Sequence, residues 1–316
     1  CLVGSEMCIR DRYLSIGRRP SAGGPPMHLR DDEPRAGTPL GSLIDFQFDG
    51  ITAGFDFIAD SKFRLCYGLG YETGYGNAEH TNPGNMMKDA HFFGFNWDVW
   101  NKDGTFVQTT VARAFDVTDG FVSNVVMPVN PVTGQASPGP IPMRYAPSAN
   151  LGDIDLAGIL VMREQGDLDL FASFNFMKSH PDASVSTPFG GLFADPFDTP
   201  EEQDATMFYL GARYKLPNGK TKIGAEYNKG SEYWFNFSHG ADDIIAPKTG
   251  TRGSVVELYA THRFARKLVG KLSFMNYSYD YSGSGWHLGA PKDLGETQML
   301  GFPTYKEIRQ LTLSLM

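Results

Sequence analysis

The stretch that decides the fold is Phe63-Arg64-Leu65-Cys66-Tyr67-Gly68-Leu69-Gly70-Tyr71-Glu72-Thr73-Gly74. Its odd positions are large and apolar or aromatic up to Thr73, and its even positions are small or polar. Because successive side chains of a strand point to opposite faces, one face is apolar and the other is nearly bare. The length matches the roughly 9–11 residues with which a tilted strand crosses a bilayer. We therefore predict a transmembrane β-barrel with a hydrated interior.

The composition agrees with a barrel and excludes two other classes of protein. Glycine contributes 36 of the 316 residues, more than the usual share of about 7%. The longest apolar run, residues 156–162, is far shorter than the ~20 residues of a membrane helix, which excludes a helical membrane protein. Barrel strands alternate and average to mild hydropathy. The net charge of −8 argues against nucleic acid as a partner.

The first residues differ in character from the rest of the chain. Residues 1–12 resemble the translated sequencing-adaptor tail that occurs at the ends of metagenomic reading frames. That resemblance implies that 1–12 is not native, that Cys1 and Cys8 form no disulfide, and that the barrel domain spans 13–316. We also expect truncation at both ends. A chain cut at its start could not show a signal peptide, and none is visible, while residues 311–316 lack the terminal aromatic residue that bacterial barrels usually carry.

Short and long connections strictly take turns along the chain. The short ones contain tight-turn signals, and the long ones are rich in Pro, Gly, Asn, Asp and Ser. A membrane barrel sorts its connections in this way, with short turns at one end and long loops at the other. The short connections are 58–62, 101–104, 164–167, 217–220 and 265–267, and the long ones are 20–40, 76–90, 115–149, 178–204, 236–251 and 283–303.

Twelve strands are predicted between these connections. The fold class is all-β: an antiparallel up-and-down transmembrane β-barrel with twelve visible strands. The predicted strands are 13–19, 41–57, 63–75, 91–100, 105–114, 150–163, 168–177, 205–216, 221–235, 252–264, 268–282 and 304–316.

The second predicted strand contains a change of phase. Ile44, Phe46 and Phe48 are apolar at even positions, whereas odd positions are apolar from Ile51 onward. A β-bulge at Asp49-Gly50 would reset the phase, and a two-residue hairpin there would also do so. We prefer the bulge, because a hairpin would leave strands that are short for a membrane and would break the alternation of connections.

Residues 14–26, 37–41 and 43–50 carry a family resemblance. Their sequences are Leu14-Ser15-Ile16-Gly17-Arg18-Arg19-Pro20-Ser21-Ala22-Gly23-Gly24-Pro25-Pro26, Gly37-Thr38-Pro39-Leu40-Gly41 and Leu43-Ile44-Asp45-Phe46-Gln47-Phe48-Asp49-Gly50. They resemble an uncharacterised family of bacterial outer-membrane barrel proteins, a domain of unknown function loosely described as porin-like. The resemblance implies the barrel fold and a place in the outer membrane of Gram-negative bacteria, and it supplies no catalytic residue.

Polar and charged residues at inward positions of the strands are candidates for the pore lining. Their acidic and basic groups are nearly balanced, so no ion selectivity follows. Cross-strand pairing that braces a wet wall is the alternative role. The candidates are Arg64, Glu72, Asn96, Asp98, Asp153, Asp155, Asp169, Arg213, Lys215, Lys222, Glu226, Glu257, Arg263 and Lys271.

Two of the long loops carry functional hypotheses. The loop 115–149 contains an apolar run and is expected to fold inward and constrict the channel, or to form a lid over the rim. The loop 20–40 mixes both signs of charge and is expected to be solvated, with contact to an anionic solute or lipopolysaccharide as the alternative. The constriction residues are Phe121, Val122, Val125, Val126 and Met127.

The predicted function is a porin-like outer-membrane channel for passive diffusion of small hydrophilic solutes, not an enzyme. Its partners are outer-membrane lipid, lipopolysaccharide and the solute. No cofactor or metal is expected, because the seven histidines lack metal-ligand spacing. One alternative is a structural or ligand-binding barrel with a plugged lumen. Another is a lipid-modifying enzyme, although Ser238-His239 lacks a nucleophile elbow.

A cysteine scan from Phe63 to Gly74 tests which face of the strand meets water. We expect even positions to react with a membrane-impermeant thiol reagent and odd positions to be protected, because the side chains alternate between lumen and lipid. Labelling is read by mass spectrometry. Equal labelling of the two sets would contradict the two-faced wall.

Overall fold

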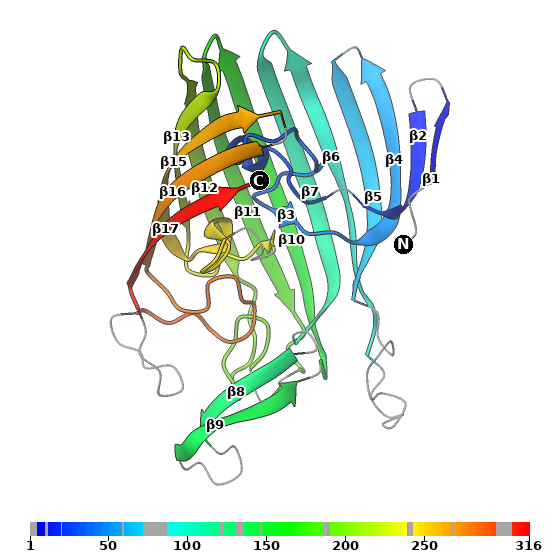
Figure 1. The fold of residues 1–316 in the computed structure, drawn as a ribbon. Helices are drawn as coiled ribbons and strands as arrows, with labels where there is room; N and C mark the ends of the chain where they lie inside the picture. The colour runs from blue at the N-terminus through cyan, green and yellow to red at the C-terminus, as the bar shows by residue number, and fades with distance from the viewer. Residues whose placement is uncertain are drawn as a thin grey trace.

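An antiparallel sheet forms the wall of the molecule (Figure 1). The computed structural model describes residues 5–9, 12–19, 21–58, 60–71, 87–119, 123–129, 136–145, 147–185, 187, 190–238, 243–266, 268–294 and 305–316. Within these ranges the sheet has 13 strands, and neighbours in the sheet follow chain order. The sheet curves strongly, and its edge strands β1 and β17 are not hydrogen-bonded to each other in the part of the chain described. This confirms the all-β antiparallel fold class.

Each of the twelve predicted strands has a counterpart in the sheet. A further strand, β1, lies in residues 1–12 and pairs with β2. Backbone pairing needs no particular side chain, so the non-native origin of 1–12 stays a prediction. The strands of the wall are β1 Ser5–Ile9, β2 Arg12–Arg18, β4 Asp49–Ile58, β5 Ser61–Tyr71, β6 Ala90–Lys102, β7 Thr105–Thr118, β10 Asn150–Gln165, β11 Leu168–Pro181, β12 Asp204–Lys215, β13 Thr221–Gly230, β15 Gly253–Ala265, β16 Leu268–Tyr279 and β17 Glu307–Leu315.

Within the described part of the chain, two small sheets and two short helices lie outside the wall. Strand β3 (Ile44–Asp45) pairs in parallel with β14 (Phe237–Ser238), and β8 (Ser123–Val129) pairs with β9 (Ala136–Tyr145). The 3-10 helices are η1 (Met27–Leu29) and η3 (Lys248–Gly250). No helix within the described ranges is long and apolar enough to cross a membrane.

The connections are sorted between the two ends of the sheet, as the alternation of short and long segments predicts. Pairs such as β6 and β7 or β10 and β11 are joined by two-residue turns at one end. The connections that carry β3, the β8–β9 hairpin and β14 are long and start from the opposite end (Figure 1). We call these the short-turn end and the long-loop end.

The β-bulge predicted at Asp49-Gly50 is wrong, and so is the hairpin alternative. The wall strand β4 begins at Asp49, and the preceding apolar residues lie outside the wall. Phe46 and Phe48 pack on Phe92 from the concave side, with ring centroids 5.4 and 6.1 Å away. The change of phase therefore marks the point where the chain enters the wall, because Phe46 and Phe48 bury against protein rather than face lipid.

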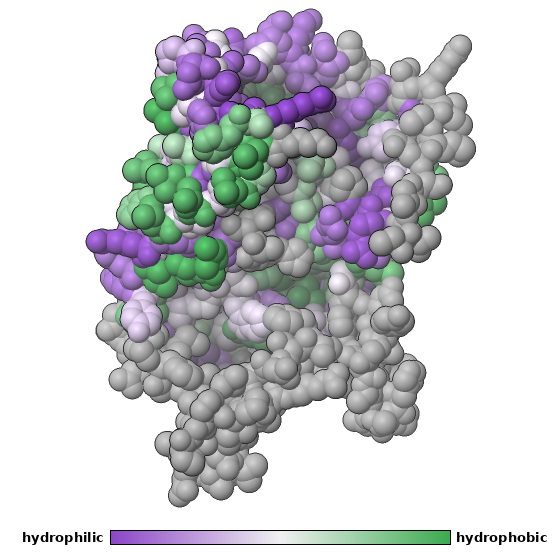
Figure 2. Space-filling view, viewed as in Figure 1, coloured by the Kyte–Doolittle hydropathy of each residue, from purple (hydrophilic) through white to green (hydrophobic). Residues whose placement is uncertain are grey.

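The two faces of the wall differ in polarity as the alternation requires. On β12 the outward Phe208 is 51% exposed, whereas the neighbouring inward Tyr209 is fully buried. Leu258, Leu272 and Leu313 are likewise exposed on β15, β16 and β17. Figure 2 shows the resulting hydrophobic band over these three strands, with hydrophilic residues beyond it. An apolar outer band of this kind suits contact with lipid.

Leu258→Arg tests whether this band meets hydrocarbon. Leu258 lies in the middle of β15, so we expect the substitution to lower the free energy of unfolding in lipid vesicles by about 2–4 kcal/mol. The matched control is Phe264→Arg near the short-turn end of the same strand, where the cost falls to about 0–1 kcal/mol. Equilibrium unfolding in denaturant measures both. Equal costs at the two depths would contradict a membrane-spanning β15.

Candidate pore interior

Residues 21–48, between β2 and β4, fold into the concave side of the sheet, and we call them the inward segment (Figure 1). Leu40 and Leu43 are fully buried there. The Leu40 amide donates to Thr110 Oγ1 of β7 (3.1 Å), and Leu43 accepts from the Phe237 amide (2.9 Å). The expectation of a solvated loop at 20–40 is therefore wrong for this segment, because its groups find partners on the wall.

Asp32 anchors the inward segment to three wall strands. It accepts from Lys222 of β13, from Arg263 of β15 (2.7 Å) and lies 3.5 Å from Arg213 of β12. Burial alone would raise the pKa of Asp32, but the hydrogen bonds from Lys222 and Arg263 outweigh it and lower this pKa from its ordinary value. Asp32 is thus an anion held by cations of the wall.

Two further contacts extend this anchor. Arg213 also pairs with Asp169 of β11 (2.7 Å) and donates to the Leu29 carbonyl of the inward segment (2.8 Å). Asp31 accepts from Lys271 of β16 (2.7 Å). The adjacent Asp31 and Asp32 together neutralise cations from four strands, so the wall in this half presents positive charge that the segment balances.

A second anchor is a buried cluster of charges around Arg30. Its guanidinium donates to Asp243 (2.5 Å) and lies 3.6 Å from Glu257 of β15. Lys248 of η3 reaches both Glu257 (2.5 Å) and Glu226 of β13. With Lys271 at 3.5 Å from Glu257, three cations face three carboxylates, and all six residues are buried. Each charge has an opposite charge close by, and such pairing is what makes burial of charge tolerable.

A third anchor lies on the other half of the wall. Asp98 of β6 pairs with Arg64 of β5 (2.9 Å) and with Arg35 of the inward segment (3.3 Å). Gln108 of β7 bridges the two parts, because its Nε2 donates to Asp98 (2.6 Å) and to the Thr38 carbonyl (2.8 Å). The inward segment is therefore fastened on both sides of the concave face.

Most of the predicted pore-lining residues take part in these anchors or sit beside them. Nine have charged contacts described above: Arg64, Asp98, Asp169, Arg213, Lys222, Glu226, Glu257, Arg263 and Lys271. Their role as a pore lining stays a prediction.

The remaining candidates lie apart. Asp155 pairs with Arg113 (2.5 Å) and Asp153 accepts from the Asp116 amide (3.0 Å), both toward the long-loop end. Lys215 is exposed at the short-turn end, Asn96 lines a cavity of the wall, and Glu72 lies outside the described residues.

The sequence did not single out the partners supplied by the inward segment. Arg30, Asp31, Asp32 and Arg35 stood in a run of mixed charge that also fits a solvated loop. The only sign of the pairing in the sequence was that the wall strands carry cationic residues, Lys222, Arg263 and Lys271, which could pair with the acidic residues of that run. No local pattern connects the two sets, whose contacts join residues 190–240 positions apart.

The predicted constriction residues that the structure describes lie in the β8–β9 hairpin, not in the inward segment. Val125, Val126 and Met127 belong to β8, which pairs with β9 in its own small sheet. This hairpin extends beyond the long-loop end of the wall (Figure 1), and Phe121 and Val122 lie outside the described residues. Constriction by these five residues stays a prediction. Residues 21–48, by contrast, do lie inside the concave face.

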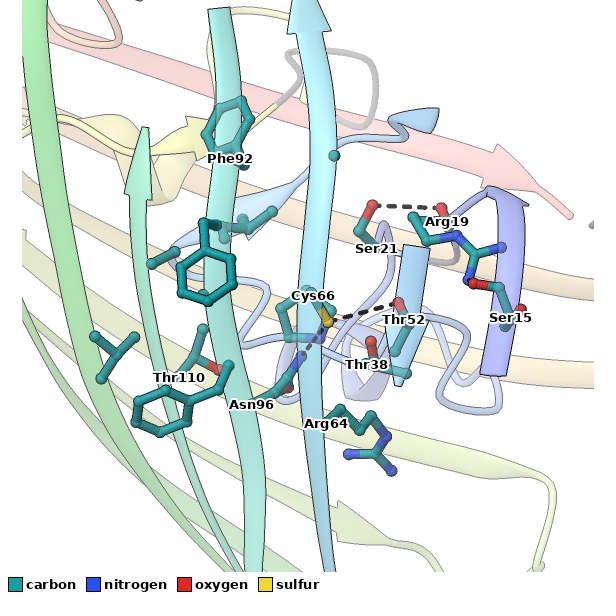
Figure 3. A pocket seen from close by; sticks show the side chains of 18 of the residues that line it. Ser15, Arg19, Ser21, Thr38, Thr52, Arg64, Cys66, Phe92, Asn96 and Thr110 are labelled. Carbon is teal, nitrogen blue, oxygen red and sulfur yellow. Dashed lines mark hydrogen bonds between the residues drawn. The ribbon is translucent and has the colours of Figure 1, made fainter. Parts of the chain in front are cut away.

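A cavity of about 480 Å³ remains between the inward segment and strands β2 to β7 (Figure 3). Hydroxyls from Ser15, Ser21, Thr38, Thr52 and Thr110 line it. Its charged lining residues are four basic and one acidic: Arg12, Arg19, Lys62, Arg64 and Asp56.

Two polar atoms at this cavity are buried without a hydrogen-bond partner among the described residues: Arg64 Nη1 and Asn96 Oδ1. Figure 3 shows both side chains at the cavity beside Cys66, which contacts Asn96 and Thr52. Buried polar groups normally find partners, so the cavity suits water or a polar solute.

A curved sheet with an apolar outer band, a polar concave face and a segment folded inside defines the class as a β-barrel of the porin fold. The chain belongs to the family described as "Protein of unknown function (DUF3373)", whose model matches residues 8–316. No curated protein matches the chain.

Several solved structures align with this chain. In vitro folded OmpT of Vibrio cholerae in its trimer form aligns at a TM-score of 0.50 with 12% identity, over 92% of this chain and 75% of that chain. OmpT expressed in the outer membrane aligns at 0.48 with 12% identity, over 92% and 76%. An anion-selective porin from Comamonas acidovorans aligns at 0.48 with 10% identity, over 86% and 66%. The first of these alignments supports the porin fold, and nothing more than the fold.

Asp32→Asn tests the first anchor. We expect it to lower the free energy of unfolding in vesicles by about 2 kcal/mol at neutral pH, because charge-assisted hydrogen bonds to Lys222 and Arg263 are lost. Since the folded pKa of Asp32 is lowered, its contribution is present above the ordinary aspartate value of about 4 and is lost as pH falls through the lowered value. Denaturant unfolding at several pH values measures this.

The matched control is Glu33→Gln, at the neighbouring exposed position of the inward segment. It should leave stability unchanged within about 0.5 kcal/mol. If Asp32→Asn and Glu33→Gln had the same free energy of unfolding at neutral pH, the contacts of Asp32 would not stabilise the protein.

Proposed function

We propose that this protein is a porin-like channel of the bacterial outer membrane, through which small hydrophilic solutes diffuse passively. The observation that carries the proposal is the polar cavity of about 480 Å³ left between the inward segment and the wall. The inward segment fills part of the lumen, and the polar cavity remains beside it. This arrangement matches a narrowed pore. Outer-membrane lipid and lipopolysaccharide are the surroundings that the apolar outer band would meet.

The charges of this cavity favour anions over cations. Four basic residues and one acidic residue line it, although the chain as a whole carries a net charge of −8. Lys62 lies 3.5 Å from Asp56 and Arg64 pairs with Asp98 (2.9 Å), which leaves the basic Arg12 and Arg19 in excess. Rings of arginine and lysine select anions in pores. Diffusion of this kind requires no catalytic group, cofactor or metal, and the proposal includes none.

A second candidate is a structural or ligand-binding barrel whose lumen is closed. The buried cluster of Arg30, Lys248 and Glu257 favours it, because buried ion pairs hold the inward segment in one position. The two candidates differ in whether the remaining cavity connects the two sides of the membrane.

Conductance in a planar bilayer separates the two candidates. We expect discrete open-channel steps and an anion preference in a salt gradient. Arg64→Gln should lower the anion-to-cation permeability ratio about twofold, because it removes one cation from the cavity lining. The matched control is Arg163→Gln at the short-turn end of β10, outside that cavity. A folded but silent protein would exclude the channel and favour the closed barrel.

A further inference from the structure

A second cavity, of about 450 Å³, lies at the long-loop end of the concave face. Aromatic rings from five parts of the chain line it: Phe46 of the inward segment, Phe92 of β6, Phe115 of β7, Phe235 and Phe237 at β14, and Trp286 from the loop after β16. Ala114 and Val117 of β7 complete its apolar wall. We call it the aromatic cavity.

The rings of this cavity pack on one another in the geometries that aromatic pairs prefer. Phe92 and Phe237 meet edge to face with centroids 4.7 Å apart, and Phe235 and Phe237 do so at 5.0 Å. Phe46 lies 5.4 Å from Phe92 in a tilted arrangement. The cluster presents both ring faces and ring edges, to which a further aromatic ring can add.

The aromatic cavity is uncharged, unlike the polar cavity beside it. No Asp, Glu, Lys or Arg lines it within the described part of the chain. His287 donates from Nε2 to the Thr118 carbonyl (2.7 Å), and burial lowers its pKa, so the ring is neutral at physiological pH. The lining offers only a few neutral polar groups, among them the Ser238 hydroxyl, which donates to Asn236 Oδ1 (3.0 Å) and keeps acceptor capacity.

The walls of the cavity are held in place by hydrogen bonds outside it. Arg252 donates to the carbonyls of Trp286 (2.6 Å) and Ser282 (2.9 Å), which fixes the loop that carries Trp286. Asn236 donates to the Ser42 carbonyl (2.9 Å) and so ties the β14 region to the inward segment. A site that is formed before binding loses little free energy to ordering.

We propose that the aromatic cavity binds a small neutral aromatic compound with one hydrogen-bonding substituent. Its volume is about three times the ~150 Å³ of an apolar cavity that holds benzene, which is room for a substituted one-ring or two-ring molecule. The ring would pack on Phe92 and Phe237, and the substituent would donate to Ser238. An anion would lose its hydration at a lining that offers no cation. This binding goes beyond the proposed channel function and does not depend on conduction.

Binding of 2-naphthol to the full-length protein in lipid vesicles tests the proposal, with fluorescence anisotropy as the readout and protein-free vesicles as the background. We expect saturable binding. Phe92→Ala should weaken it about tenfold through loss of a ring contact, whereas Phe93→Ala, at the neighbouring outward position, should leave it within about twofold.

Ala114→Phe serves as the second variant, because it fills the cavity without removing a ring and should also weaken binding about tenfold. Heat-dependent gel mobility reports whether each variant has folded. If Phe92→Ala does not fold, the binding measured with Ala114→Phe tests the proposal. 2-Naphthoate, of similar size but anionic, should bind at least about tenfold more weakly. Two results would overturn the proposal. One is equal affinity for 2-naphthol in all folded variants, which partitioning into lipid would produce. The other is binding of 2-naphthoate as tight as that of 2-naphthol.

Discussion

Hydrocarbon offers no hydrogen-bond partner to a peptide group, and this constraint governs the whole architecture. Every backbone amide in a membrane-spanning wall must pair with a neighbouring strand, which requires a continuous antiparallel sheet. The same wall must be apolar toward lipid, and the period of two then leaves its other face free to be polar. Phe208 and Tyr209 on β12, one exposed and one buried, show this division at adjacent positions.

The polar face creates a second requirement, because its charges need partners once a segment covers them. The inward segment supplies these partners with Arg30, Asp32 and Arg35, each opposite a group of the wall with the opposite sign. Two of the cavities left uncovered differ in chemistry: one near Arg64 is polar and basic, and one near Phe237 is aromatic and uncharged. Phe92 lines both, so the two spaces adjoin at that ring.

The wall could be predicted from the sequence because its signal is local. Alternation and turn residues located every wall strand of the described residues except β1, and the inward positions of strands such as β6 and β15 followed from the same period. The content of the lumen could not be predicted, because it depends on contacts such as Asp32 with Arg263 across 231 positions. The apolar residues before Asp49 gave one indication of the inward segment, because their alternation was out of phase with the wall strand that follows.

The central claim is that residues 21–48 occupy the lumen, and one crosslink tests it directly. Ser42 Oγ lies 3.1 Å from Asn175 Oδ1 of β11, so the pair Ser42→Cys and Asn175→Cys should bring two thiols together. The measurement is dibromobimane fluorescence in vesicles, with Cys1, Cys8 and Cys66 replaced by serine. We expect rapid crosslinking in the double variant and none in either single variant. If both thiols of the folded double variant instead remained free and reacted separately with an impermeant reagent, the inward segment would not lie against the wall.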